Sequence, residues 1–501
     1  MKLKELIINI IYMLLSIPLY YLTKGTNLLP LTLSIYLYLI LSSIFNHIDN
    51  YDYVKDYYDK NYTYSINIVY KYTNISIILI NIIITILISI LTYLLNKLFN
   101  IDNLILINIA LSLTLFIKPV LRNISNICSI YKFKTLKDNI FNIYNILNII
   151  FILLTIILGR KLFPNKTYIF IILIYLSSII SFILVYILCK SMVLKDKVKK
   201  KQFKKTIERT DYKKIILNII NRNIVISIKD IVYYSYNYIG LVILYFVLKN
   251  RYGYSYDSVS NILTNYFLYG YSIINIFILL IKYHIVDKIN DINKNLKDTN
   301  IVIEDYLINI SKFIITLVII LSITSRSIYN LIYTSNEGYI LHMLSINMVF
   351  SILYYIVVNI FINNIKNKKI YIIMSLGILL KLILIVPLIN SIYRMGYNMI
   401  YGDILINTIS YIFVITLLFI TGKNKYKVDF TKKFDKILDI IYYNIILCSI
   451  LLLISLVIPI KVSSKLDSLK VILIYSVISI LYIYLRKKMK TNERIIIKNK
   501  N

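Results

Sequence analysis

The stretch KDKVKKKQFKKTIERTDYKK, residues 195–214, is a run of basic residues inside an otherwise apolar chain. The chain has 501 residues, of which 58% are hydrophobic, with a mean hydropathy of +0.72 and a formal net charge of +33 at pH 7. A soluble nucleic-acid-binding domain does not combine such a charge with such a hydropathy. We therefore interpret 195–214 as a loop at a membrane surface and expect no nucleic-acid partner.

On both sides of this loop, apolar runs of roughly 18 to 25 residues recur along the whole chain, and each is long enough to cross a bilayer core of about 30 Å. The runs are continuous rather than alternating, which favours helices over strands. The sequence therefore predicts an all-α polytopic membrane protein with about 14 transmembrane helices. The predicted spans are 5–23, 28–46, 74–96, 103–121, 139–159, 167–189, 215–248, 258–281, 303–334, 338–362, 370–390, 398–421, 437–459 and 466–485.

Basic residues are distributed unequally between the two sets of connections. The termini and every second loop hold 40 Lys and Arg, against 11 in or directly beside the opposite set. Because short loops rich in Lys and Arg stay in the cytoplasm, we expect both termini and the 195–214 loop to be cytoplasmic in a multi-pass protein of the cytoplasmic membrane. These basic loops are expected to contact anionic lipid headgroups. The apolar N-terminal run is interpreted as the first helix rather than as a signal peptide.

The basic loop also divides the spans into groups, because six precede it and six follow it before a final pair. This 6+6+2 pattern predicts two pseudo-symmetric bundles, as in transporters whose substrate path lies between two halves. The predicted segments are a six-helix bundle at 1–190, a basic linker at 191–214, a second six-helix bundle at 215–421, a second basic linker at 422–436, a helix pair at 437–485 and a basic tail at 486–501.

Several cations fall inside the predicted spans, where each costs about 2.5–3.5 kcal/mol at a helix centre unless it finds a partner, a wet cavity or an interface. Position suggests that Arg222 and Lys312 reach a membrane surface. Lys118 precedes Pro119, where a helix break could open a cavity. Two interpretations therefore stay open for Lys118, a position at such a cavity and a side chain that reaches the membrane surface. The cations inside predicted spans are Lys118, Arg222, Lys229, Lys312, Arg326 and Lys381.

Lys381 stands in the middle of its span with Gly377 one turn earlier on the same face, which predicts a cation that faces the bundle. Lys229 and Asp230 are neighbours that point about 100° apart on a helix, so at least one should pair with another helix. From the seventh predicted span onward, we interpret Asp230 as the only acidic residue that lies well inside a span. Asp439 also falls within a predicted span, but near its end. A structural ion pair and a role in substrate binding or cation coupling both remain open for Asp230.

No catalytic motif is recognisable. The chain has no P-loop, no GxSxG, no HExxH and no Asp-rich metal motif, so we expect neither an enzyme nor a bound cofactor or metal. The histidines and cysteines are scattered, which argues against a metal site and against a disulfide framework. These residues are His47, His284, His342, Cys128, Cys189 and Cys448.

Several strings, taken in order, resemble the multidrug/oligosaccharidyl-lipid/polysaccharide (MOP) flippase superfamily, in its polysaccharide-transporter branch that includes the stage V sporulation protein B family. The strings are SIPLYYLTKG (16–25), SIYLYLILSSI (34–44), IKPVLRNISNICSIYKFKT (117–135), ISIKDIVYYSYNYIGLVIL (226–244) and the long run 373–420. The positions that match the family's structural or hinge residues are Pro119, Arg122, Gly377, Pro387, Gly396 and Gly402.

The resemblance implies a V-shaped, two-lobed helical bundle that flips a lipid-linked saccharide or a peptidoglycan precursor by alternating access. Cations in a cavity would suit the pyrophosphate of such a substrate. The candidates for binding it are Lys118, Lys229, Lys381 and Arg326. A cation-coupled multidrug exporter, with Asp230 as the coupling acid, is the first alternative. The second is a degenerate, non-transporting paralogue that acts as a scaffold for envelope-synthesis proteins.

Overall fold

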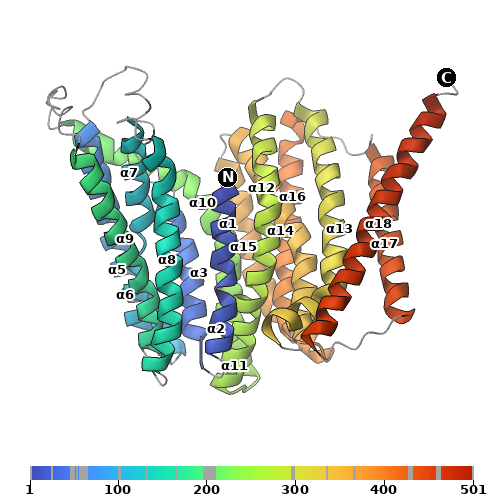
Figure 1. The fold of residues 1–501 in the computed structure, drawn as a ribbon, viewed down its shortest axis with the longest axis horizontal. Helices are drawn as coiled ribbons and strands as arrows, with labels where there is room; N and C mark the ends of the chain where they lie inside the picture. Colours follow the sequence, from blue (N-terminus) through green and yellow to red (C-terminus); the bar gives the residue numbers. More distant parts are fainter. Residues whose placement is uncertain are drawn as a thin grey trace. The chain divides into compact units, whose positions relative to one another are not determined.

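A computed structural model gives the architecture of the chain (Figure 1). It describes residues 3–498 except for 24–25, 46–50, 52–54, 56–65, 100–102, 131–133, 164–165, 196–209, 295–298, 335–336, 365–367, 427–432 and 458–463. The centres of both predicted basic linkers, 196–209 and 427–432, thus lie outside the described residues.

The chain forms two compact units, residues 1–267 and 268–501. The first unit contains helices α1 (Leu3–Leu14), α2 (Ser16–Leu22), α3 (Leu29–Phe45), α5 (Ile66–Phe99), α6 (Leu104–Ser112), α7 (Ile117–Ile130), α8 (Lys134–Leu162), α9 (Thr167–Lys195), α10 (Thr210–Phe246) and α11 (Tyr256–Leu263). The second contains α12 (Tyr271–Lys294), α13 (Thr299–Tyr333), α14 (Gly338–Asn364), α15 (Lys368–Arg394), α16 (Ile400–Tyr426), α17 (Phe434–Val457) and α18 (Lys465–Lys498). Two short π-helical segments, Val247–Arg251 and Thr264–Gly270, flank α11.

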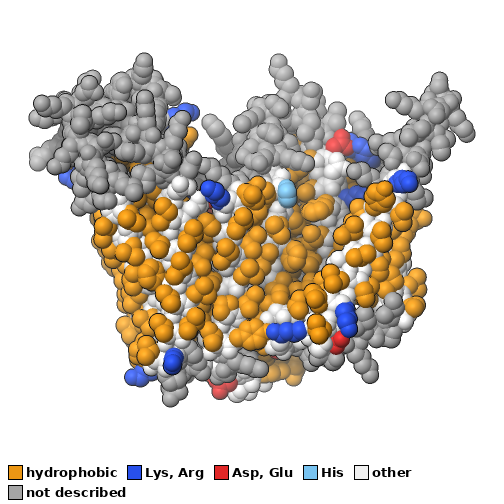
Figure 2. Space-filling model, viewed as in Figure 1, with side chains coloured by type: hydrophobic (Ala, Val, Ile, Leu, Met, Phe, Trp, Pro, Cys, Tyr) orange, Lys and Arg blue, Asp and Glu red, His pale blue; other side chains and the backbone are white. Residues whose placement is uncertain are grey.

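The predicted fold class is confirmed. Within the described ranges, 13 helices are long and apolar enough to cross a membrane, and the 17-residue apolar helix α3 occupies the remaining predicted span. Large apolar side chains are exposed along these helices, for example Ile83 at 57%, Ile383 at 68% and Leu453 at 61%. Figure 2 shows apolar side chains covering most of one face, interrupted by few charges. Such a surface is suited to lipid rather than to water.

The seventh predicted span, 215–248, falls on α10 and on the π-helical segment that follows it. Among the described residues, the candidate membrane span in this part of the chain is Asp230–Arg251, and α10 itself begins at Thr210.

In the first unit, α3 packs against α10, α5 against α6, and α8 against α9. The boundary of the unit at residue 267 places α10 and α11 together with the N-terminal helices. The predicted division into a 1–190 bundle and a 215–421 bundle is a statement about pseudo-symmetry and stays a prediction.

In the second unit, α15 packs against α16, and α14 against both α13 and α16. The C-terminal pair docks on α13 through a cluster of Leu447, Leu451, Val471 and Tyr475, against which Ile319, Ile320 and Ile323 pack.

Polar contacts reinforce this docking of the C-terminal pair. Thr316 donates to Asn444 at 3.0 Å, and Lys433 binds the carboxylates of Glu304 and Asp305 at 3.3 and 3.0 Å. Lys433, at the end of the second basic linker, is thus held by protein carboxylates. The contact of the basic loops with lipid headgroups stays a prediction.

Candidate functional site

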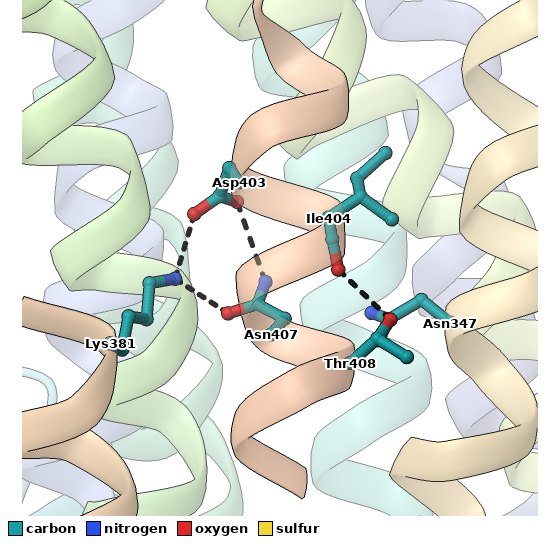
Figure 3. Close-up of polar contacts among 6 residues, drawn as sticks. All are labelled: Asn347, Lys381, Asp403, Ile404, Asn407 and Thr408. Carbon is teal, nitrogen blue, oxygen red and sulfur yellow. Dashed lines mark hydrogen bonds and ion pairs between the residues drawn. The ribbon is translucent and has the colours of Figure 1, made fainter. Parts of the chain in front are cut away.

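Lys381 and Asp403 form a fully buried ion pair in the second unit. Lys381 Nζ lies 2.7 Å from Asp403 Oδ1, and neither side chain is exposed. The cation comes from the middle of α15 and the carboxylate from the first turn of α16 (Figure 3). Burying a charge costs roughly several kcal/mol per ion, and close pairing together with further hydrogen bonds must offset this cost.

Asn407 supplies these further hydrogen bonds. Lys381 Nζ donates to Asn407 Oδ1 at 2.6 Å, and Asn407 Nδ2 lies 3.4 Å from Asp403 Oδ2. Asp403 and Asn407 are one turn apart on α16, so both face the same side of the helix. The ammonium is therefore held by a carboxylate and an amide oxygen, which together form a compact cation site.

Close packing of α15 and α16 brings these groups together. A Cβ on Gly402 would lie only 2.8 Å from Ile389 Cα, so this approach requires glycine at position 402. Gly377, Lys381, Ile385 and Ile389 recur every four residues on α15 and are all buried, which defines the face that packs inward.

The polar network continues to α14. The hydroxyl of Thr408 has two acceptors within hydrogen-bond distance, Asn347 Oδ1 at 3.1 Å and the carbonyl oxygen of Ile404 at 2.9 Å. Figure 3 shows Asn347 and Thr408 on the side of α16 away from Lys381. Polar side chains thus link α14, α15 and α16 through the interior of the second unit.

This arrangement limits the chemistry of Lys381. Because both side chains are completely buried, an anionic ligand can reach the ammonium of Lys381, or a cation the carboxylate of Asp403, only if the packing around the pair opens. The cluster can therefore act as a structural lock between helices or as a charged pair that opens during a transport cycle. A role of Lys381 in binding substrate stays a prediction.

The other predicted cations lie elsewhere. Lys118 is exposed in the first turn of α7, and Lys229 lies in α10 with a side chain that the structure does not describe. Arg326 is exposed on α13, and within the second unit it lies outside the buried cluster of Lys381. Asp230, the predicted coupling residue, is half-buried at the first residue of the apolar part of α10.

The helix is interrupted beside Lys118. Helix α6 ends at Ser112 and α7 begins at Ile117, within a single candidate span. Backbone bonds from Thr114 to Leu111 and from Leu115 to Ser112 close the intervening turn. Pro119 is buried in the first turn of α7, where its missing N–H is tolerated. Arg122 is half-buried one turn further on.

The remaining predicted positions belong to the α15–α16 hairpin. Gly377 and Gly402 are buried at the packed face, whereas Pro387 is exposed inside α15. Gly396 has a φ of +79° in the turn between the two helices, a conformation that favours glycine.

Sequence reasoning missed Asp403 and Asn407. The expectation that Asp230 was the only acid well inside a span of this region was wrong, because Asp403 is completely buried in α16. Its signal was present, since Asp403 falls within the predicted span 398–421 and follows directly after the span of Lys381. Opposite charges on successive spans are candidates for a pair.

No family model and no curated protein matches the chain. The solved structures that share its fold include the following three. The lipid II flippase MurJ, in an inward closed conformation, has 15% identity, a TM-score of 0.58, and coverage of 97% of this chain and 98% of its own. The eukaryotic MATE transporter AtDTX14 has 10% identity, a TM-score of 0.51 and coverage of 87% and 96%.

The third structure is an inward-facing multidrug resistance MATE family transporter of the MOP superfamily, with 12% identity, a TM-score of 0.51 and coverage of 85% and 95%. At these identities the likeness is one of architecture. The chain has the helical fold that a lipid II flippase and MATE transporters share.

Proposed function

We propose that this chain is a membrane transporter that moves a lipid-linked saccharide or peptidoglycan precursor between leaflets. The observation that carries the proposal is the likeness to a lipid II flippase over 97% of the chain. The cations within the candidate spans agree with it, because a pyrophosphate that leaves water needs positive charge. Lys118 and Arg326 are exposed and thus accessible to such a group without breaking an ion pair.

The proposed site of action is the cytoplasmic membrane, with both termini in the cytoplasm. Excess basic charge on the termini and alternate loops supports this orientation. The proposed partners are the lipid-linked substrate, anionic lipids at the basic loops and proteins of envelope synthesis.

The direct test is reconstitution of the purified protein in vesicles with a fluorescent polyprenyl-pyrophosphate sugar in one leaflet. A flippase should make the probe accessible in the other leaflet at a rate that scales with protein. In cells, depletion should cause the lipid-linked intermediate to accumulate, and its chemical identification would name the substrate.

A cation-coupled multidrug exporter is the second candidate, favoured by the likeness to two MATE transporters and by Asp230 within the candidate span of α10. For this function, vesicles should accumulate a lipophilic cation when an ion gradient is applied, and Asp230→Asn should abolish accumulation without loss of folded protein. Movement of neither probe would favour the scaffold alternative.

A further inference from the structure

Three polar residues of the α13–α14 hairpin lie on neighbouring turns, apart from the buried Lys381 cluster. Arg326 is exposed on α13, and Ser322 precedes it by one turn. His342 is exposed on α14, and its Nδ1 lies 2.6 Å from Ser322 Oγ.

The packing of the two helices fixes the register of this group. A Cβ on Gly338 would lie 2.3 Å from Arg326 Cα, so Gly338 sits directly against Arg326. His342 lies one turn after Gly338, and Ser322 lies one turn before Arg326. These two residues are also in contact. Arg326 and His342 therefore lie one helical turn apart, about 6 Å along the helix axes. Because Gly338 has no side chain, no side chain from that position of α14 occupies the space in front of Arg326.

The hydrogen-bonding capacity of the group is largely unused. Among the described residues, the guanidinium of Arg326 makes no ion pair or hydrogen bond, and this includes Glu337, the neighbour of Gly338. His342 Nδ1 lies 2.6 Å from Ser322 Oγ and 3.1 Å from the Ser322 carbonyl oxygen. When Nδ1 accepts from the Ser322 hydroxyl, the ring proton is on Nε2, which can then donate to a ligand. Helix side chains lean toward the N-terminus of their helix, which directs Arg326 toward the turn of Ser322 and His342.

Both helices are candidate membrane spans, and Arg326 lies about two turns before the end of its span at Tyr333. An uncompensated Arg at such a depth is unfavourable, and its lean toward Ser322 takes it away from the nearer end of the span. The planar guanidinium matches two oxygens of a phosphate, and an imidazole N–H can donate to a third.

We propose that Arg326, His342 and Ser322 form a binding site for a phosphate group, carried by a lipid headgroup or supplied as free phosphate. The site deepens the proposed function and rests on it, because Arg326 is one of the cations there offered to the pyrophosphate of the substrate. The binding measurement below requires no transport, so loss of the phosphate adduct and loss of flipping are separate outcomes.

Native mass spectrometry of the purified full chain in detergent tests the site, with dioleoyl phosphatidic acid as the probe. Dioleoylglycerol, which has the same acyl chains and no phosphate, is the matched negative. The basic loops also bind phosphatidic acid, so the measured quantity is one high-affinity adduct. Arg326→Gln should weaken this adduct about tenfold or more, and His342→Gln by a smaller factor.

Two variants serve as controls, because Arg394 and His284 are also exposed in the second unit. Arg394→Gln and His284→Gln should leave the adduct unchanged. Competition by inorganic phosphate would mean that the site accepts free phosphate, and binding without such competition would assign the lipid headgroup. Equal binding of dioleoylglycerol, an unchanged adduct in Arg326→Gln, or an equal loss in Arg394→Gln would overturn the proposal.

Discussion

Lys381 Nζ lies 2.7 Å from Asp403 Oδ1, with both side chains completely buried between α15 and α16. Removal of either partner leaves an uncompensated charge in the interior, whereas removal of both leaves none. Replacing a buried pair by apolar residues of similar size is often neutral or stabilising, and breaking one costs about 3–5 kcal/mol. The pair therefore gives a test that separates structure from transport.

We expect Lys381→Met and Asp403→Leu each to lower the unfolding temperature of the purified protein strongly, and the double variant to recover most of the loss. Thermal unfolding in detergent measures this coupling. A stable double variant that still transports assigns the pair a purely structural role, and one that has lost transport assigns it a part in the cycle. Single variants as stable as the wild type would contradict the buried geometry.

Gly402→Ala should separate α15 from α16, because the new Cβ would stand 2.8 Å from the backbone of Ile389 and cannot be relieved by a rotamer change. Overpacking of this kind costs typically about 1–3 kcal/mol. Gly159→Ala is the matched control, since its Cβ would meet only the Phe170 ring, at 3.1 Å, which can shift. A fall in unfolding temperature with Gly402→Ala that is no larger than with Gly159→Ala would contradict the close approach.

Lys433 should hold the C-terminal pair more firmly than Lys436 does. The side chain of Lys433 is 13% exposed and binds the carboxylates of Glu304 and Asp305. The side chain of Lys436 is 59% exposed and, of these two carboxylates, binds that of Asp305. We expect Lys433→Gln to lower the unfolding temperature more than Lys436→Gln. An equal effect of the two variants would argue against a special role for Lys433.

The pH dependence of this contact follows from the charge of Lys433. Burial lowers the pKa of Lys433, but hydrogen bonds with Asp305 and Glu304 outweigh burial and leave the pKa above its usual value of 10.5. A group whose pKa is raised in the folded state adds to the free energy of unfolding. This contribution is fully present below the pKa of the unfolded state and is lost as the pH rises through the pKa of the folded state. The difference in stability between wild type and Lys433→Gln should thus be constant from about pH 7 to pH 9 and vanish only above the usual lysine range. A difference that disappears near neutral pH would contradict this assignment.

The orientation in the membrane can be tested with single cysteines in a variant that lacks Cys128, Cys189 and Cys448. Cysteines in 195–214 and 422–436 should resist an impermeant thiol reagent added to intact cells, because these loops are basic and expected in the cytoplasm. Cysteines near Lys24 and Glu337 should react. Labelling of 195–214 from outside would reverse the predicted topology.

Hydropathy was sufficient to predict the 13 candidate spans of the described residues and the apolar helix α3, because crossing a membrane is a local property of about 20 residues. The pairing of Lys381 with Asp403 could not be predicted, since it depends on the register of two helices. That register is set by the contact of Gly402 with Ile389, which no pattern within either helix records.

The exposed and buried cations should respond differently to neutralisation. Lys118 is exposed beside the interruption at 113–116, and it makes no ion pair or hydrogen bond with the described residues. Lys118→Gln should therefore leave the unfolding temperature unchanged. If Lys118 contacts the pyrophosphate of a lipid-linked substrate, its loss removes a charge-assisted bond worth about 1.5–3 kcal/mol and slows flipping of the fluorescent probe about tenfold or more. Lys381→Gln, in contrast, should lower the unfolding temperature because it strands Asp403.

The Lys118→Gln variant also distinguishes a flippase from an exporter of cations, because a lysine in the path attracts pyrophosphate and repels a lipophilic cation. In vesicles, Lys118→Gln should slow the pyrophosphate probe and leave export of a lipophilic cation unchanged or faster. Slower export of the cation would indicate that Lys118 acts on transport in general rather than on substrate charge. A pyrophosphate probe that moves at the same rate with and without Lys118 would remove this residue from the substrate path and leave Arg326 as the exposed cation to be tested next.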